Sequence, residues 1–245
     1  MIGLGNFLFK YRNLVFPLVF VLMIVGTEPF LISSQTEKWI YATGIVITLV
    51  GQFIRALTIG LAYIVRGGRD KKVYAKNLVK NGIFAHCRNP LYLGNILIVS
   101  GLGVVADSTV FYFIGIPFFF LSYMAIIKAE ENYLTGKFGE EYTEYCRKVS
   151  RLIPDLSGIR TTIKSMTFNW SRLIVKEYGT TYTWMIALIL LIVKNKYLLY
   201  GHELDRTVIW VSSLSFITVT FFYALARFLK KTGRLVAEKR EPSGA

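Results

Sequence analysis

The sequence predicts an all-α protein, a polytopic transmembrane helical bundle of about six spans with amphipathic helices on its cytosolic side. Apolar residues make up 53% of the 245 residues and charged residues only 18%, whereas soluble domains usually carry about 25% charged residues. The apolar residues also gather into stretches long enough to cross a bilayer, which takes roughly 20 helical residues. A soluble core of buried helices would need polar faces, which these stretches lack.

Six apolar stretches define the predicted spans. They run over Leu14–Ile32, Trp39–Val65, Leu91–Ala106, Thr109–Ile127, Tyr182–Val193 (extending to Tyr200) and Thr207–Leu229. The third stretch is short, but Asp107 and Ser108 suit a tight turn into the fourth, so the two together predict a helical hairpin. Small residues in the third stretch, Gly94, Gly101 and Gly103, predict close packing against a neighbouring helix.

The basic residues predict the orientation of these spans. The net charge of +14 comes mainly from lysines and arginines before the first span, between the second and third, between the fourth and fifth, and after the sixth. The alternate connections hold few: Lys38 in the first, none in the second, and Lys194, Lys196 and Arg206 in the third. The positive-inside rule therefore predicts a multi-pass integral membrane protein with both termini cytosolic. The excess charge is expected to face anionic membrane lipids rather than nucleic acid.

Two polar segments show helical periodicity outside the spans. In the first, apolar residues recur at helical spacing at Phe138, Tyr142, Tyr145 and Val149, which predicts an amphipathic cytosolic helix docked on the membrane domain. After Pro154 the pattern returns at Ile159, Ile163, Met166, Trp170 and Ile174, with basic residues between them. This second segment predicts a helix lying in the membrane interface.

A few polar residues lie within or at the ends of the predicted spans, where membrane proteins rarely have them. Arg55 lies inside the second span, with Gln52 one turn before it on the same face. A charge there either faces a bundle interior or cavity or extends along the helix to the headgroups, and both interpretations stay open. Glu130 and Glu131 stand where the fourth span reaches the cytosol, a position at which carboxylates are usually solvated. His86, in the basic loop, is expected to be exposed.

Five short motifs between Gly51 and Pro154 resemble one known family in order and spacing. They are Asn77-Leu78-Val79-Lys80-Asn81-Gly82-Ile83-Phe84, Arg88-Asn89-Pro90-Leu91-Tyr92-Leu93-Gly94, Glu130-Glu131, Phe138-Gly139-Glu140-Glu141-Tyr142 with Tyr145, and Leu152-Ile153-Pro154. This series resembles the isoprenylcysteine carboxyl methyltransferases and related phospholipid methyltransferases. Their pattern reads H-L-V-x-x-G-x-Y, R-H-P-x-Y-x-G, a hairpin, E-E and F-G-x-x-Y-x-x-Y.

The resemblance implies that S-adenosylmethionine binds at the cytosolic membrane face. The implied cofactor-binding residues are Asn77, Leu78, Val79, Phe84, Asn89, Pro90, Leu91, Tyr92 and Glu130. A carboxylate such as Glu130 can accept hydrogen bonds from the ammonium and ribose hydroxyls of this cofactor. Arg55 and Glu130 are the candidate catalytic residues, and no metal site is expected.

The chain departs from the family pattern in three ways. Amides replace histidines at Asn77 and Asn89, and Phe84 replaces a tyrosine. The enzymes that act on prenylcysteine resemble one another in having an arginine, which engages the substrate carboxylate, where this chain has Ile126. A prenylcysteine acid is therefore expected to be a poor substrate unless Arg55 or Lys128 supplies the missing charge.

The function implied by the resemblance is methyl transfer from S-adenosylmethionine to a lipophilic, membrane-embedded acceptor at the cytosolic face. Residues 1–154 would form the membrane methyltransferase core, with its motifs in residues 51–154. Residues 155–245 would add the interfacial helix and an accessory pair of transmembrane helices. Two alternatives remain open: an NADPH-dependent membrane reductase of similar architecture, whose basic loop Arg66–Lys80 would accept phosphates, and a non-catalytic membrane scaffold.

The predicted orientation can be tested by cysteine labelling of intact cells. In a background without Cys87 and Cys146, a membrane-impermeant maleimide should miss thiols introduced as Lys72→Cys and Lys239→Cys, because both positions are expected in the cytosol. The reagent should reach Glu203→Cys, which lies in an outer connection. The reverse labelling pattern would contradict a cytosolic location for the motifs.

Overall fold

The structure is a computed structural model that describes residues 1–25, 27–61, 75 and 77–237. Its regular elements are α1 (Ile2–Ile24), α2 (Glu37–Leu61), the 3-10 helix η1 (Gly82–Ala85), α3 (Pro90–Ala106), the π-helix η2 (Phe111–Gly115), α4 (Ile116–Phe138), α5 (Glu140–Lys148), α6 (Ile159–Lys164), α7 (Trp170–Leu199) and α8 (Arg206–Lys231). Five helices are long and apolar enough to cross a membrane: α1, α2, η2 with α4, α7 and α8. With the shorter α3, of 17 residues, they confirm the predicted helical bundle.

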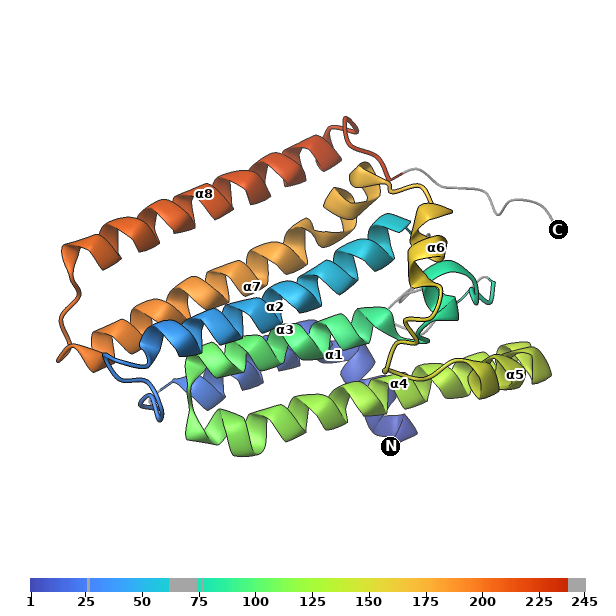
Figure 1. The fold of residues 1–245 in the computed structure, drawn as a ribbon, viewed down its shortest axis with the longest axis horizontal. Helices are drawn as coiled ribbons and strands as arrows, with labels where there is room; N and C mark the ends of the chain where they lie inside the picture. The colour runs from blue at the N-terminus through green and yellow to red at the C-terminus, as the bar shows by residue number, and fades with distance from the viewer. Residues whose placement is uncertain (26, 62–74, 76, 238–245) are drawn as a thin grey trace.

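The long helices run side by side, and the polar segments gather at one end of the bundle (Figure 1). Helix α2 packs along α3, α1 along α4, and α7 against both α2 and α3, while α8 packs on α7 at one edge. The elements η1, α5 and α6 lie together at the end where α2 finishes and α3 begins (Figure 1). We call this end the polar end. Most of the basic loop Arg66–Lys80 falls outside the described residues.

Glycines bring α2 and α3 unusually close together. A Cβ atom added at Gly51 would lie 2.6 Å from the carbonyl oxygen of Gly94, and one added at Gly101 would lie 2.5 Å from that of Gly44. Real Cβ atoms essentially never come so near another heavy atom, so larger side chains at these positions would force the helices apart. The predicted role of Gly94 and Gly101 in close packing is therefore confirmed.

The first helix differs from its predicted span. It begins at Ile2 and ends at Ile24, whereas the apolar stretch predicts a helix from Leu14 to Ile32. The helix does not extend to Ile32 because the backbone N–H groups of Leu31 and Ile32 donate to the Asp107 carboxylate at 2.6 and 2.7 Å. These residues are thus held outside the helix. At the other end the helix begins at Ile2, so Lys10 and Arg12, which were expected to precede the first span, lie within α1.

The predicted interfacial helix is also divided differently. Only Ile159–Lys164 forms the separate helix α6, and Trp170 begins the long helix α7 instead. The side chain of Asn169 accepts a hydrogen bond from the backbone N–H of Arg172 at 2.8 Å, which is the usual way in which a helix is started. The docked helix predicted from Phe138 onward is present as α5, and its Tyr142 is buried.

The hairpin between α3 and η2 turns on Asp107, which is fully buried and has a left-handed backbone (φ 49°). Besides the two backbone donors described above, its carboxylate accepts a hydrogen bond from the Tyr112 hydroxyl at 2.9 Å. This side chain therefore ties the α1–α2 connection to the hairpin at the end opposite the polar end.

Removal of this carboxylate should destabilise the fold. We expect Asp107→Ala to lower the free energy of unfolding by at least about 1.5–3 kcal/mol, the usual contribution of a hydrogen bond to a charged group, because the backbone N–H groups of Leu31 and the buried Ile32 lose their acceptor. Denaturation in detergent micelles measures the change. Asp205→Ala is the matched control, since Asp205 also accepts from a backbone N–H but is exposed at the start of α8. An equal loss for both variants would contradict the anchoring role of Asp107.

Candidate functional site

Tyr92 and Glu130, two of the predicted cofactor-binding residues, meet at the polar end. The Tyr92 hydroxyl, in the first turn of α3, donates to Glu130 Oε1 in α4 at 2.6 Å. Arg12 of α1 donates to the same hydroxyl at 3.1 Å. Only 5% of Glu130 is exposed. Three helices that are separated in the sequence thus place an aromatic hydroxyl between a guanidinium and a buried carboxylate.

The adjacent Glu131 faces a different set of partners. Its Oε1 lies 3.0 Å from Arg88 Nη1, and its Oε2 accepts from Arg151 Nη2 at 2.8 Å. The hydrogen bond to Glu131 raises the pKa of the Arg151 guanidinium above its usual range. Glu131 is buried, as is Glu130, so these two carboxylates are not solvated as carboxylates at such a position usually are. The helix separates them because consecutive residues on a helix point in different directions.

The loop that carries the first motif folds back onto α5 and α6. Phe84 is buried, and its carbonyl accepts a hydrogen bond from the Tyr145 hydroxyl at 2.7 Å. His86 is also buried, with Nδ1 2.7 Å from the Asp155 carbonyl and Nε2 2.9 Å from Thr162 Oγ1. The expectation that His86 is exposed is therefore wrong. Its ring instead fastens the loop to the segment that leads into α6.

The second motif begins α3. Asn89 is buried and its Nδ2 donates to the carbonyl of Arg151 at 3.2 Å. Pro90 is the first residue of the helix, where its missing N–H costs no hydrogen bond. Leu91 and Tyr92 follow in the same turn. The four predicted residues of this motif are therefore consecutive at the start of α3, and Tyr92 connects them to Glu130 of α4 by its hydrogen bond.

The first three predicted cofactor residues lie apart from that cluster. Asn77 is exposed, and Leu78 and Val79 are half-buried. Leu78 packs against the small apolar cluster that includes Tyr142 and Tyr145 of α5. Among the described residues no hydrogen bond joins these three residues to Tyr92 or Glu130, so their place in a cofactor site stays a prediction.

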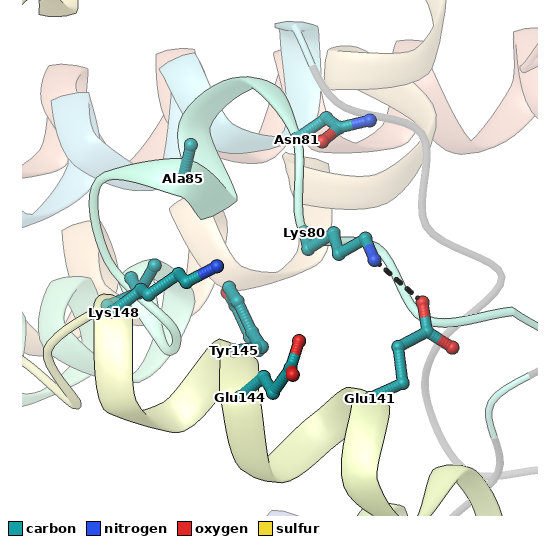
Figure 2. Close-up of a pocket in the computed structure, with 8 residues that line it drawn as sticks. Lys80, Asn81, Ala85, Glu141, Glu144, Tyr145 and Lys148 are labelled. Carbon is teal, nitrogen blue, oxygen red and sulfur yellow. Dashed lines mark hydrogen bonds and ion pairs between the residues drawn. The ribbon is translucent and has the colours of Figure 1, made fainter.

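A polar hollow of about 230 Å³ opens between the loop and α5 (Figure 2). It is lined by Lys80, Asn81, Ala85, Glu141, Glu144, Tyr145, Lys148 and Val149. Lys80 and Glu141 form an exposed ion pair of 2.8 Å at its edge (Figure 2). Sites for small molecules usually measure about 300–1,000 Å³, and none of the lining residues was predicted to bind cofactor. This hollow alone does not define the cofactor site.

The residues around Asn89 fit the chemistry of S-adenosylmethionine. The Nε of Arg88 is buried and has no hydrogen-bond partner within the described part of the chain, which suits it to a ligand carboxylate. Glu130 offers a carboxylate for an ammonium or for hydroxyls. Arg88 stands two residues before α3, and Tyr92 in the first turn of that helix contacts Glu130 of α4. The donor set therefore matches a ligand that carries both charges.

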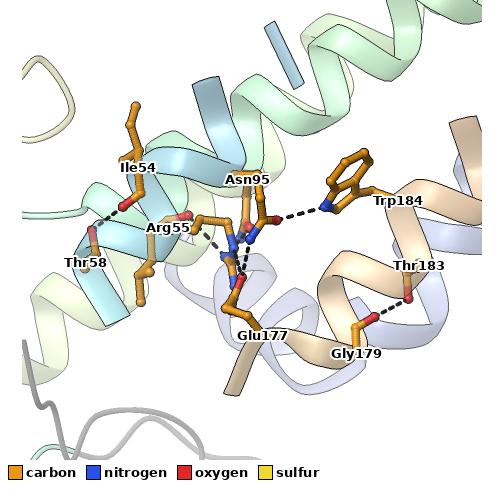
Figure 3. A network of polar contacts seen from close by, with 10 residues as sticks. Ile54, Arg55, Thr58, Asn95, Glu177, Gly179, Thr183 and Trp184 are labelled. Carbon is orange, nitrogen blue, oxygen red and sulfur yellow. Dashed lines mark hydrogen bonds and ion pairs between the residues drawn. The ribbon is translucent and has the colours of Figure 1, made fainter. Parts of the chain in front are cut away.

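Arg55 faces a carboxylate inside the bundle (Figure 3). Its Nε and Nη2 donate to the two carboxylate oxygens of Glu177 in α7, at 2.8 and 2.5 Å. Its Nη1 lies 2.5 Å from Asn95 Oδ1 and 3.5 Å from the Leu91 carbonyl oxygen, both in α3. Arg55 is 9% exposed and Glu177 is 3% exposed. Of the two interpretations that the sequence left open, the structure supports the first: the Arg55 side chain faces the interior of the bundle.

Glu177 was missed from the sequence because it follows the basic residues of the predicted interfacial helix. It is the single acidic residue of α7. An arginine within a membrane span usually pairs with an acidic group, and that rule would have pointed to Glu177. Gln52 joins the same network, since its Nε2 lies 3.4 Å from Glu177 and its Oε1 accepts from Trp184 Nε1 at 2.8 Å.

The position of Ile126 agrees with an apolar environment. Its side chain is fully buried in the core cluster. Lys128, one candidate to replace the family arginine, is exposed, and Arg55, the other candidate, already binds Glu177. Neither Lys128 nor Arg55 therefore supplies the positive charge that the family arginine would provide at the position of Ile126.

Fold and site together define a polytopic helical membrane protein with a buried, charged site at one end of its bundle. A family model described as phospholipid methyltransferase matches residues 23–141. The chain is 27% identical over 139 residues to the mouse (Mus musculus) protein-S-isoprenylcysteine O-methyltransferase, a match that spans 51% of this chain and 45% of the mouse protein. Residues 23–141 thus match the phospholipid methyltransferase family, and the chain is similar to the isoprenylcysteine carboxyl methyltransferases, which are integral membrane methyltransferases.

Two bacterial relatives match more of the chain. The nickel-cobalt-cadmium resistance protein NccN of Alcaligenes xylosoxydans xylosoxydans is 28% identical over 162 residues, or 64% of this chain and 71% of the relative. The cobalt-zinc-cadmium resistance protein CzcN of Cupriavidus metallidurans is 29% identical over 161 residues, or 64% and 70%. No solved structure matches the chain. Among the described residues, no group of three histidines, cysteines or acidic residues is arranged to hold a metal ion.

Proposed function

We propose that the protein transfers the methyl group of S-adenosylmethionine to a lipophilic acceptor that enters from the bilayer. The observation that carries the proposal is the contact between Tyr92 and Glu130, which joins two of the family's motifs at one point of the bundle. Similarity to membrane methyltransferases supports this function over the reductase and the scaffold that the sequence left open.

Each group has a distinct part in the proposed site. Glu130 would hold the ammonium or ribose hydroxyls of the cofactor, and Tyr92 would fix the direction of that carboxylate. Arg88 and Asn89 would face the cofactor's carboxylate. When bound, the cofactor supplies an electrophilic methyl group that is already activated. The protein's contribution is then alignment of the acceptor and exclusion of water.

We further propose that the polar end faces the cytosol. The described segments that meet there, residues 77–89 and the chain from α5 to the start of α7, hold many of the basic residues between spans. The opposite end contains the Asp107 turn and few basic residues. This distribution follows the positive-inside rule.

The cofactor can be tested by thermal unfolding of the purified protein in detergent or nanodiscs. S-adenosylhomocysteine, the demethylated product, should raise the melting temperature in a concentration-dependent way, because a ligand that binds the folded state stabilises it by mass action. Glu130→Gln should weaken binding roughly ten- to hundredfold, since a charge-assisted hydrogen bond contributes about 1.5–3 kcal/mol.

Glu131→Gln is the matched control for this experiment. It makes the same chemical change one residue along α4, but Glu131 binds Arg88 and Arg151 rather than Tyr92. We expect it to lower the melting temperature and to reduce the rise caused by S-adenosylhomocysteine less than Glu130→Gln does, because Glu131 would act on the cofactor only through Arg88. A rise with NADPH and none with S-adenosylhomocysteine would favour the reductase and contradict the proposal.

The acceptor is expected to differ from a prenylcysteine acid. The carboxylate of such a substrate would meet the apolar Ile126, and a buried carboxylate without a partner is strongly disfavoured. Transfer of a labelled methyl group should therefore be slow with farnesylcysteine analogues and faster with another lipophilic component of membrane extracts. Rapid turnover of farnesylcysteine analogues by the unmodified protein would show that the inference from Ile126 is wrong.

A further inference from the structure

The ion pair between Arg55 and Glu177 links the family's motif region to a helix that lies beyond it. Arg55 is in α2, within residues 23–141 that match the family model, whereas Glu177 is in α7, outside that range. Trp184 and Leu191 of α7 also belong to the same apolar core as α1 to α4. Helix α7 is thus packed as part of the bundle, whereas the sequence predicts only an accessory place for it.

Nearly all hydrogen-bonding groups of Arg55 are engaged. Glu177 accepts from Nε and Nη2, and Nη1 contacts Asn95 and the Leu91 carbonyl. A guanidinium has five N–H donors in a fixed plane, so a bidentate carboxylate fixes the direction of the remaining side of the group. The charge of Arg55 is balanced by Glu177 as well. Arg55 is therefore poorly suited to receive a substrate carboxylate, and well suited to hold neighbouring parts of the protein in place.

The part that Arg55 holds is the beginning of α3. Its Nη1 reaches the Leu91 carbonyl and the Asn95 side chain, one turn apart. Its stem lies against Gly94, since a Cβ atom added there would be 2.5 Å from Arg55 Cγ. Tyr92, which directs its hydroxyl to Glu130, stands within this same stretch. Both the aliphatic part and the guanidinium of Arg55 thus contact the turn that carries Tyr92.

We propose that Glu177 is a positioning residue for the methyltransferase site, acting through Arg55. Glu177 fixes the guanidinium, the guanidinium fixes Leu91–Asn95, and that turn sets the reach of Tyr92 to Glu130. The inference rests on the proposed function for its effect on the cofactor. It makes α7 part of the functional unit, so that a protein ending after the family motifs would lack a component of the site.

A purely structural role for the pair makes a different prediction. Replacement of a buried ion pair by apolar side chains of similar size is often neutral or stabilising, whereas removal of one partner is strongly destabilising. The stability of the fold and the geometry of the first turn of α3 can therefore be separated by experiment. The double variant Arg55→Met with Glu177→Met retains packing but removes every contact from the guanidinium to Leu91 and Asn95.

The test compares Glu177→Gln with a control at the other end of the same two helices. Glu37 of α2 and Lys196 of α7 form an ion pair of 2.9 Å, so Glu37→Gln also breaks a link between α2 and α7. For each full-length variant, amide hydrogen exchange is measured over residues 90–95, and the dissociation constant of S-adenosylhomocysteine is measured by titration. We expect Glu177→Gln to raise both the exchange rate and the dissociation constant about tenfold, and Glu37→Gln to change neither.

The double methionine variant decides between positioning and stability, and it remains informative if Glu177→Gln does not fold. It should melt near the temperature of the unmodified protein, yet show the same fast exchange and weak binding as Glu177→Gln. Tight binding and slow exchange in the double variant would overturn the proposal, as would equal effects of Glu177→Gln and Glu37→Gln. If the unmodified protein does not bind S-adenosylhomocysteine, the proposed function fails, while the exchange rates still decide the positioning role.

Discussion

A charged side chain inside a membrane bundle must find its partner within the protein, because hydrocarbon offers neither water nor counterions. Three sets of partners meet this constraint towards the polar end. Arg55 binds Glu177, Arg12 reaches Glu130 through the Tyr92 hydroxyl, and Arg88 and Arg151 both contact Glu131. Each set joins segments distant in the sequence. The arrangement of the helices at this end is thus tied to the pairing of these charges.

The close approach of α2 and α3 makes this pairing possible. Glycines in both helices let the two backbones nearly touch, and the stem of Arg55 passes over Gly94 on its way to Glu177. A larger residue at that position would displace either the arginine or the helix. The close packing of α2 and α3 therefore also shapes the turn from which Tyr92 reaches Glu130.

The family resemblance and the structure describe overlapping but different extents of the protein. The motifs end before residue 155, and the family model ends at residue 141. The polar contacts continue through Arg151, which binds Glu131, and through Glu177, which binds Arg55. Differences among relatives in residues 142–199 would therefore alter the support of the site rather than its motifs.

The sequence by itself determined the class of the protein, its hairpin turn at Asp107 and the motifs that carry its family resemblance. It could do so because apolar length and local spacing are properties of short segments. It also singled out Arg55 and Glu130. Only the tertiary structure decided which carboxylate Arg55 meets, that Glu130 and Glu131 have separate partners, and that His86 is buried. It also showed that Leu31 and Ile32 bind the Asp107 carboxylate outside α1. These outcomes depend on contacts between residues some twenty to 122 positions apart, which no local pattern in one sequence records.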